Sequence, residues 1–218
     1  MNKWRCLKGA LLFLIFFAST TVSVAGELQT IKLPAPDKKG GRPLMQVLNE
    51  RRTSREFSTR ELPEQVISNI LWAAFGINRP ASGKRTAPSA VNWQEIDIYL
   101  ASREGVYLYD PGEHSLEPYM EEDIREHTGR QKFTSVAPVN LIYVADHRRM
   151  KGTDDQQKIF YSAADTGFIS QNVYLYCASE GLATVVIGAV DKKALEKVMA
   201  LEPHRKVILT QTVGYPPR

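Results

Sequence analysis

A cluster of basic and hydroxyl side chains lies in the segment NERRTSREFS. Its five members are consecutive: Arg51, Arg52, Thr53, Ser54 and Arg55. Guanidinium groups donate paired hydrogen bonds to a phosphate, and hydroxyl groups add further polar contacts. The segment is therefore a candidate site for a phosphate monoester. On composition alone, a solvated turn is an equal alternative.

A second polar segment, PSAVNWQ, leads directly into an alternating apolar stretch that is typical of a strand. It places Pro88, Ser89 and Asn92 in the loop before that strand. The carboxamide of Asn92 offers a donor and an acceptor side by side, which suits the N3–H and carbonyl edge of a flavin ring. The two segments together favour a flavin phosphate over a solvated turn. Trp93 is a candidate for the substrate pocket, with a place in the core as the alternative.

Four segments resemble motifs of the nitroreductase superfamily, and they occur in the order found in that family. RRTSREF is similar to the flavin-phosphate motif, and PSAVNWQ is similar to the P-S-x-x-N-x-Q loop. AADTGFISQNVYLYCASEGLATVVIGAVD resembles the long central helix and the loop after it. VILTQTVGYPP resembles the closing strand with its Gly-Tyr-Pro turn. The resemblance covers roughly residues 43–217, nearly the whole predicted mature chain.

The resemblance implies an α+β fold with three layers, in which a mixed, mostly antiparallel sheet is flanked by helices. A long central helix would lie at the interface of a homodimer. The implied activity is that of an FMN-dependent oxidoreductase, which transfers a hydride or electrons through flavin N5 to or from a small organic substrate such as a nitroaromatic or a quinone. The residues that match the family's flavin-binding positions are Arg51, Arg52, Thr53, Arg55, Pro88, Ser89, Ala90, Asn92, Ile187, Gly188, Ala189 and Arg218.

By this resemblance, the arginine-rich segment would bind the phosphorylated tail of FMN. Arg51, Arg52 and Thr53 would contact the phosphate and the ribityl chain. Arg55 would reach the N1/O2 edge of the ring, where a fixed cation stabilises the negative charge that develops on reduction. Asn92 would bond to the pyrimidine edge.

Two further segments would meet the ring. Ser89 and Ala90 would pass close to it, and Ile187 would lie on one of its faces. The backbone amides of Gly188 and Ala189 would donate toward N5 and O4. A flavin carries out the hydride transfer itself, so no catalytic acid or base is expected among the side chains.

The chain departs from the family pattern at three points. The usual Gly-Leu-Gly is Gly181-Leu182-Ala183, and Val186 stands before the Ile-Gly pair where proline is commoner. The basic residues that many members have after the Gly-Tyr-Pro turn are represented here by Arg218. We expect the first two changes to preserve the fold.

Two alternative functions share the same binding motifs. The short first helix and the compact size also resemble the branch of the superfamily that contains the azoline-forming thiazole and oxazole dehydrogenases, which act on peptides. A flavin-binding or flavin-carrying protein without catalytic activity would need the same arginine and asparagine contacts. No G-x-G-x-x-G or G-x-x-x-x-G-K-[ST] motif occurs, so the sequence supports neither a Rossmann nor a P-loop nucleotide site.

Residues 1–25 are typical of a secretory signal peptide. Lys3, Arg5 and Lys8 precede the apolar run ALLFLIFFA, and Ser23-Val24-Ala25 is a small-residue cleavage pattern. We therefore expect an exported, periplasmic protein, with a retained N-terminal membrane anchor as the alternative. Because NADH and NADPH are cytosolic pools, the electron donor is expected to be something else, such as a membrane quinol or a redox partner.

Charge and cysteine content narrow the function further. Removal of the signal would take three bases and no acid from a formal net charge of +4, leaving +1, which does not favour nucleic acid as a ligand. Cys177 would be the one cysteine of the mature chain, so no intrachain disulfide is expected, and its helical surroundings favour a buried packing role. The four histidines share no metal-ligand spacing, so no structural zinc site is expected.

Apolar periodicity predicts the elements that must position these segments. An extended arm is predicted over residues 26–42 and one domain over residues 43–218. Helices are predicted at 43–52, 63–75, 155–180 and 192–201, and strands at 95–101, 105–110, 139–146, 183–190 and 206–216. Residues 115–134 are polar and are predicted to be helical or loop-like.

The helix predicted at 155–180 is apolar on nearly every side. One face of a sheet cannot cover such a helix. We therefore expect it to be buried between the core of its own chain and a partner subunit.

Overall fold

The computed structural model describes residues 28–217, so the predicted signal peptide and Arg218 lie outside the described residues. Its main sheet has seven strands in the order β1-β6-β5-β4-β7-β9-β8, and each neighbouring pair is antiparallel. The strands of this sheet are β1 (Ile31–Lys32), β4 (Ile96–Ala101), β5 (Val106–Asp110), β6 (Ser115–Met120), β7 (Val139–Asp146), β8 (Ala183–Ile187) and β9 (Arg205–Gly214). A separate hairpin pairs β2 (Ile77–Arg79) with β3 (Lys84–Arg85).

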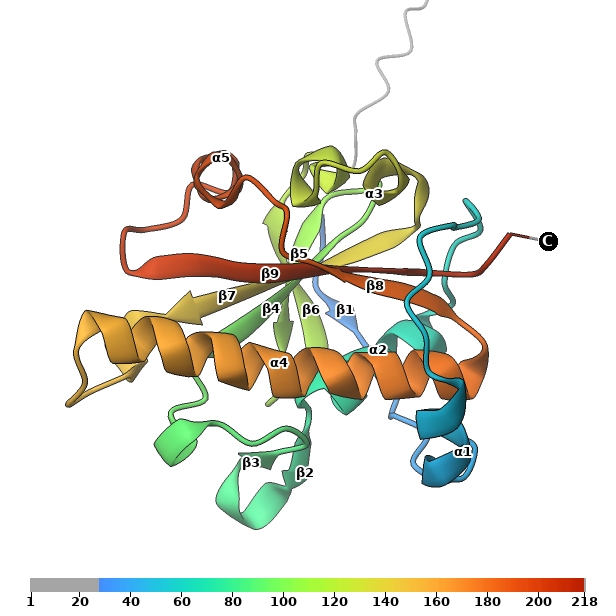
Figure 1. Cartoon of the computed structure of the whole chain (residues 1–218), viewed down its shortest axis with the longest axis horizontal. Coiled ribbons are helices and arrows are strands. Elements are labelled where there is room, and N and C mark those ends of the chain that lie inside the picture. The colour runs from blue at the N-terminus through green and yellow to red at the C-terminus, as the bar shows by residue number, and fades with distance from the viewer. Residues whose placement is uncertain (1–27, 218) are drawn as a thin grey trace, which may run out of the picture.

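Helices cover both faces of the main sheet and make a three-layer α+β fold (Figure 1). The helices α2 and α4 pack on one face, and α3 and α5 lie on the other (Figure 1). The α-helices are α1 (Leu44–Glu50), α2 (Glu64–Phe75), α3 (Phe133–Val136), α4 (Asp155–Glu180) and α5 (Lys192–Val198). The 3-10 helices are η1 (Pro80–Ser82), η2 (Ala90–Asn92), η3 (Arg125–Thr128) and η4 (His147–Arg149). The predicted fold class is confirmed.

The central strand β7 is buried along its whole length and divides the core. Leu141 and Tyr143 face the cluster formed with α2 and α4, whereas Ile142 and Val144 face the cluster formed with α5. Successive side chains of a strand point to opposite faces, so an apolar run with no polar alternation is what a two-sided strand requires.

The long helix α4 has the bounds that the sequence predicts. It begins with a capping box in which Asp154 accepts from Gln157 N–H, and it ends at Gly181 in the left-handed conformation with φ 69°. Its inward face packs on the sheet, and Cys177 on that face is fully buried, as predicted. Ile159 and Phe168 point away from this core and are exposed.

Two of the predicted segments are corrected. The segment 115–134, predicted to be helical or loop-like, contains the strand β6, because pairing with β5 across a short turn outweighs the weak strand propensity of a polar sequence that includes Pro118. In the described part of the predicted arm, residues 28–42, Ile31 and Lys32 form the strand β1, which pairs with β6 at the edge of the sheet. The arm is held further by Ser68 of α2, whose hydroxyl donates to Pro34 O at 2.6 Å.

The hairpin of β2 and β3 was not predicted, since two short polar strands carry no periodic signal. Helix α1 ends at Glu50, so the arginine cluster follows the helix instead of forming its last turn. Among residues 28–217, no helix is long and apolar enough to cross a membrane. The same residues contain no group of three or more side chains arranged to bind a metal ion.

Candidate functional site

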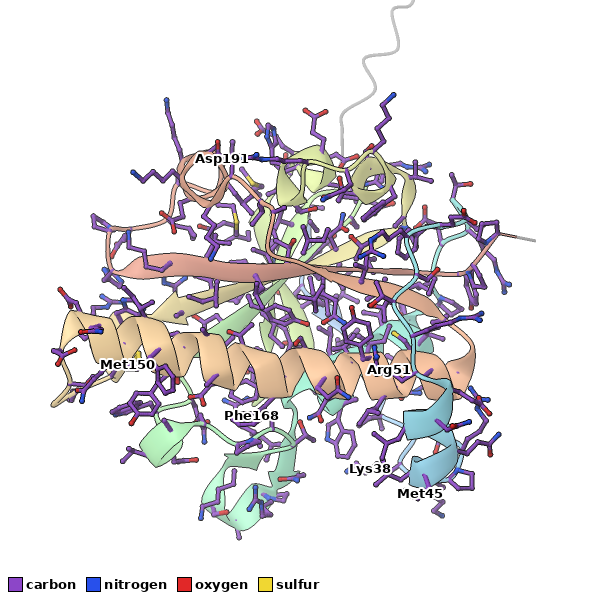
Figure 2. All side chains as sticks on the ribbon, viewed as in Figure 1. Lys38, Met45, Arg51, Met150, Phe168 and Asp191 are labelled. Atoms are coloured by element: carbon purple, nitrogen blue, oxygen red, sulfur yellow. The ribbon has the colours of Figure 1, made fainter. Side chains whose placement is uncertain are left out.

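Residues 51–55, called the arginine segment below, run from the end of α1 past α4 to the edge strand β8. Figure 2 shows Arg51 where the chain leaves α1 beside the C-terminal part of α4. The Arg51 N–H donates to Val47 O at 2.8 Å and closes the last turn of α1, and the Ser54 N–H donates to Thr184 O of β8 at 3.0 Å. These two backbone bonds fix both ends of the segment, so its side chains extend from a held backbone.

Tyr174 of α4 joins three parts of this region. Its hydroxyl accepts from the Val186 N–H at 3.0 Å and lies 3.1 Å from Thr53 Oγ1, so its own proton is free to go to Thr53. The guanidinium of Arg51 lies over the tyrosine ring, 5.1 Å from its centroid, in a cation–π contact. Tyr174 was not predicted from the sequence, because a tyrosine inside a long helix has no pattern that marks it as a ligand contact.

A pocket of about 340 Å³ opens beside the arginine segment. Its lining includes Arg42, Glu50, Arg52, Ser54, Tyr174 and Thr184. Arg42 is paired with Glu50, whereas no acidic side chain within residues 28–217 is in ion-pair contact with Arg51, Arg52 or Arg55. The segment therefore keeps positive charge that its own chain does not neutralise, and it suits an anion.

The loop of residues 89–94, called the 89–94 loop below, has a strained backbone. Val91, Asn92 and Gln94 have φ values of 50°, 60° and 49°. Positive φ is unfavourable for residues with side chains, and most of all for a β-branched one such as Val91. The Val91 side chain is 84% exposed, so packing inside this chain does not explain its conformation.

Hydrogen bonds centred on Gln94 hold this loop. Its N–H donates to Ser89 Oγ at 3.0 Å, and its side-chain oxygen accepts from Arg85 Nε at 2.8 Å. Its carbonyl accepts from Arg149 Nη1 at 2.9 Å, and its Nε2 donates to Asn92 Oδ1 at 3.1 Å. The Asn92 side chain itself is exposed. A strained loop fixed in this way is pre-organised, which is common at ligand sites.

Two buried carboxyl groups lie beneath the loop. Glu95 follows the loop directly and is fully buried, and Asp165 of α4 is 2% exposed and accepts from the Ala90 N–H at 2.8 Å. Burial raises the pKa of Glu95 to about 7, and the adjacent carboxyl of Asp165 raises it further in the same direction. Burial also raises the pKa of Asp165. Neither residue was singled out from the sequence.

The sequence does contain a pattern from which a role for Asp165 could have been predicted. The buried positions of α4 include several polar residues at the helical period: Ser162, Asp165, Thr166 and Ser170. Polar residues on the inward face of a helix need partners, so they mark a polar contact inside the fold. These positions were not predicted, because the prediction for this helix rested on its apolar residues.

The third predicted segment lies at the end of β8. Gly188 and Ala189 are exposed, and a Cβ added to Gly188 would meet nothing closer than Leu209 Cδ2 at 3.8 Å, so packing in this chain does not require glycine there. The Ile187 side chain is 4% exposed and packs with Phe57 and Phe133. That burial leaves little of the Ile187 side chain to cover a ring face, so the contribution expected from this position is its backbone.

The predicted residues therefore form two groups along α4. The arginine segment and β8 meet at Tyr174, and the 89–94 loop meets the helix at Asp165. These two helix positions are nine residues apart, about 13 Å along the axis at 1.5 Å per residue. Pro88 is exposed at the entry to the loop, and Arg218, the remaining predicted residue, lies outside the described residues.

Comparisons with known proteins agree on one family. The model of the nitroreductase family matches residues 48–215. A nitroreductase-type protein of Methanocaldococcus jannaschii is 30% identical over 190 residues, which cover 83% of this chain and 95% of that protein. A nitroreductase-type protein of Ralstonia eutropha, known from its crystal structure, is 41% identical with a TM-score of 0.84, and the match covers 90% of this chain and 93% of that one.

A more distant structure has the same fold. The NADPH:FMN oxidoreductase of Vibrio harveyi is 18% identical with a TM-score of 0.62, and the match covers 80% of this chain and 69% of that one. At 18% identity this comparison supports the fold alone.

The buried carboxyl pair predicts how stability depends on pH. Because the folded-state pKa of Glu95 is about 7 and an unfolded glutamate ionises near pH 4.3, the folded state binds more protons between these values. Stability should therefore fall as pH rises from about 4.5 to 7 and then level off. In Glu95→Gln the decrease in the free energy of unfolding that comes from ionisation of Glu95 should be absent. The change in this free energy between pH 4.5 and 7 should therefore differ between the variant and the wild type by an amount on the order of 1 kcal/mol or more.

Urea unfolding at pH 5, 6, 7 and 8 would measure this difference. Glu122→Gln, a change at an exposed position after β6, is the matched control and should keep the wild-type slope. If the free energy of unfolding depends on pH in the same way in wild type and in Glu95→Gln, the raised pKa of Glu95 is contradicted.

Proposed function

The chain belongs to the nitroreductase family and is therefore an FMN-dependent oxidoreductase, and we propose that FMN binds with its phosphate at the arginine segment and its ring at the 89–94 loop and the end of β8. One observation carries this proposal. Arg51, Arg52 and Arg55 have no acidic partner among the described residues, and Arg52 lines a pocket that also contains the hydroxyl-bearing Ser54 and Thr184. A dianionic phosphate supplies the charge that this region lacks.

Three features of the described residues fit such a ligand. The arginine segment provides guanidinium donors on a backbone fixed to Val47 and Thr184. Open space at Gly188 lets a flat ring approach the backbone at the end of β8. The strain of the 89–94 loop has no internal explanation and presents Asn92 to solvent. Each feature is left unused by the packing of the chain itself.

The residues of this chain bind and orient, and they need not react. Bound FMN would supply the hydride transfer, for which no protein nucleophile is required. Tyr174 holds Arg51 and Thr53 in place for the phosphate, and the bonds to Gln94 fix the backbone that presents Asn92. Fixed cations near a developing negative charge stabilise the reduced state of a ligand, which is the role we propose for Arg55.

The substrate we propose is a small aromatic acceptor such as a nitroaromatic or a quinone. Trp93, at the end of the η2 turn, makes an edge contact with Tyr161 of α4 at 5.7 Å, and Tyr161 makes another with Phe160 at 5.2 Å. Phe160 is largely exposed. Aromatic rings favour offset or edge contacts with other rings, so this row offers a flat acceptor a place to stack beside the loop.

The oligomer we propose is a homodimer formed through the outer face of α4. Ile159, Phe160 and Phe168 are exposed on this helix, and Met45 is exposed on the neighbouring α1. Large apolar side chains grouped on a surface mark protein interfaces. The long helix runs the whole width of the layer that it forms with α2, which leaves its outer face available to a second copy (Figure 1).

The arginine segment gives the first prediction. The purified protein should be yellow with FMN bound, and an Arg51→Ala, Arg52→Ala double variant should lose FMN affinity by about two orders of magnitude or more, since each charge-assisted contact contributes roughly 1.5–3 kcal/mol. Titration by flavin fluorescence would measure it. Arg103→Ala, at an exposed arginine between β4 and β5, is the matched control.

Riboflavin is the control ligand for the same experiment, because it has the flavin ring but lacks the phosphate. The double variant should bind riboflavin almost as well as the wild type does. If both ligands lose affinity equally, the arginines do not bind the phosphate. A folded wild-type protein that takes up no FMN in excess would overturn the proposed function itself.

The second prediction concerns the dimer. Phe168→Glu places a charge in the proposed interface and should give a monomer, because an unpaired charge is costly to bury. Sedimentation velocity at micromolar concentration would report the change, and circular dichroism would check the fold. Lys192→Glu on α5, on the opposite face of the sheet, should leave the dimer intact. A wild-type protein that is monomeric with FMN bound would contradict the model.

The third prediction concerns the compartment and the donor. We propose that the protein is exported, with residues 1–25 as its signal, and that free NADPH is not its physiological donor; this rests on the sequence, because those residues lie outside the described part of the chain. Stopped-flow mixing should show slow reduction of the FMN-loaded protein by low micromolar NADPH and faster reduction by a soluble quinol. Rapid reduction by NADPH would count against the proposal.

A further inference from the structure

The carboxyl groups of Glu95 and Asp165 have no role in the binding site proposed above. No N–H or O–H group among the described residues donates to either oxygen of Glu95. The charged group that acts most strongly on it is the neighbouring carboxyl of Asp165, which is also buried. Two ionised carboxylates have only acceptors, so they can form a hydrogen bond to one another only if one of them carries a proton.

The surroundings decide which carboxyl holds that proton. Asp165 Oδ2 already accepts from the Ala90 N–H at 2.8 Å, a contact that favours an ionised Asp165. Burial raises the pKa of both carboxyls, but no donor reaches either oxygen of the fully buried Glu95. We therefore assign the proton to Glu95, which can donate it to Asp165.

The pair connects the two ends of the 89–94 loop. Asp165 is bonded to Ala90 near its start, and Glu95 is joined by a peptide bond to Gln94 at its end. Gln94 carries most of the hydrogen bonds that hold the strained backbone. A change in the separation of the two carboxyls must therefore move one end of the loop relative to the other.

We propose that Glu95 and Asp165 are positioning residues that share one proton and thereby hold the 89–94 loop closed, and that loss of this proton opens the loop and weakens its grip on the flavin ring. The identity of the ligand rests on the proposed function. The movement of the loop does not, because it can be measured without any ligand.

Other charged groups near the pair do not provide the same switch. Arg149 of η4 faces Glu95 but is engaged by Asp97 and by the Gln94 carbonyl. Arg85 bonds to the Gln94 side chain and stays charged at neutral pH. His147 of η4 lies 3.4 Å from Ser162 Oγ, one turn before Asp165 on α4, and burial lowers its pKa below the ordinary value, so it loses its proton at a lower pH than Glu95 does.

Trp93 reports on the loop directly, because it lies within it and contacts Tyr161 of α4. The chain has three tryptophans, of which Trp4 lies in the proposed signal, so Trp72→Phe in the mature protein leaves Trp93 as the sole emitter. In this background without flavin, Trp93 fluorescence should change between pH 6 and 8 with a midpoint near 7. Glu122→Gln, the exposed control, should show the same change.

Two variants test the origin of that signal. Glu95→Gln cannot ionise and should abolish the change near pH 7. Asp165→Asn removes the like charge, so the midpoint should move to lower pH. If Glu95→Gln does not fold, the shift in Asp165→Asn still decides the matter. A flat titration in the parent, or an unchanged one in Glu95→Gln and Asp165→Asn, would overturn the proposal.

Flavin affinity provides the second measurement. A group that titrates at pH 7 is about nine-tenths protonated at pH 6 and about one-tenth at pH 8, so a loop that binds only when protonated should lose FMN affinity about tenfold over this range. Glu95→Gln should show a much smaller loss, and it experiences the same ionisation of the FMN phosphate. An identical loss in both proteins would overturn the link to the flavin. Failure to bind FMN at any pH would remove the proposed function, while the Trp93 titration would still decide whether the pair controls the loop.

Discussion

Burial of one face of α4 against the sheet is the constraint on which the rest of the structure depends. Ile169, Val173 and Cys177 are fully buried on this face, and each large apolar side chain buried in this way contributes roughly 1.5–3 kcal/mol. Once this face is fixed, the rotation of the helix is fixed as well. Asp165 then lies under the 89–94 loop, and Tyr174 lies beside the arginine segment. The packing of one helix face therefore positions both parts of the candidate site.

Ion pairs neutralise several partly buried charges of the described chain, but none of these pairs includes Arg51, Arg52 or Arg55. Arg125 is paired with Asp123, and Asp97 accepts from both Arg149 and Arg205. Such pairing is what partly buried charges require. The positive charge left at residues 51–55 is set against an apolar edge of the sheet and a tyrosine ring, an arrangement that stabilises the segment without cancelling its charge. The arginine segment can therefore be stable in the fold and still attract an anionic ligand.

The 89–94 loop differs from the arginine segment, because its backbone conformation costs free energy. Positive φ at Val91, Asn92 and Gln94 is retained by hydrogen bonds that the loop accepts from Arg85 and Arg149 and by one that it donates to the carboxyl of Asp165. Burying two carboxyl groups beneath such a loop adds a further cost that a single shared proton reduces. Strain and buried charge at the same place are consistent with selection for a function of the loop, since a stable fold alone requires neither.

The sequence by itself determined the family, the α+β class, the bounds of α4 and β7, and the identity of the segments that carry polar groups. These features are local, because helical period, capping residues such as Asp154 and Gly181, and consecutive motifs are written in neighbouring residues. The tertiary structure alone decided that β6 is a strand, that Ile187 points into the core, that Tyr174 contacts the arginine segment and β8, and that Glu95 and Asp165 lie beneath the 89–94 loop. Each of these depends on a contact between residues distant in the chain, and the free energy of such a contact is invisible until the fold brings its two partners together.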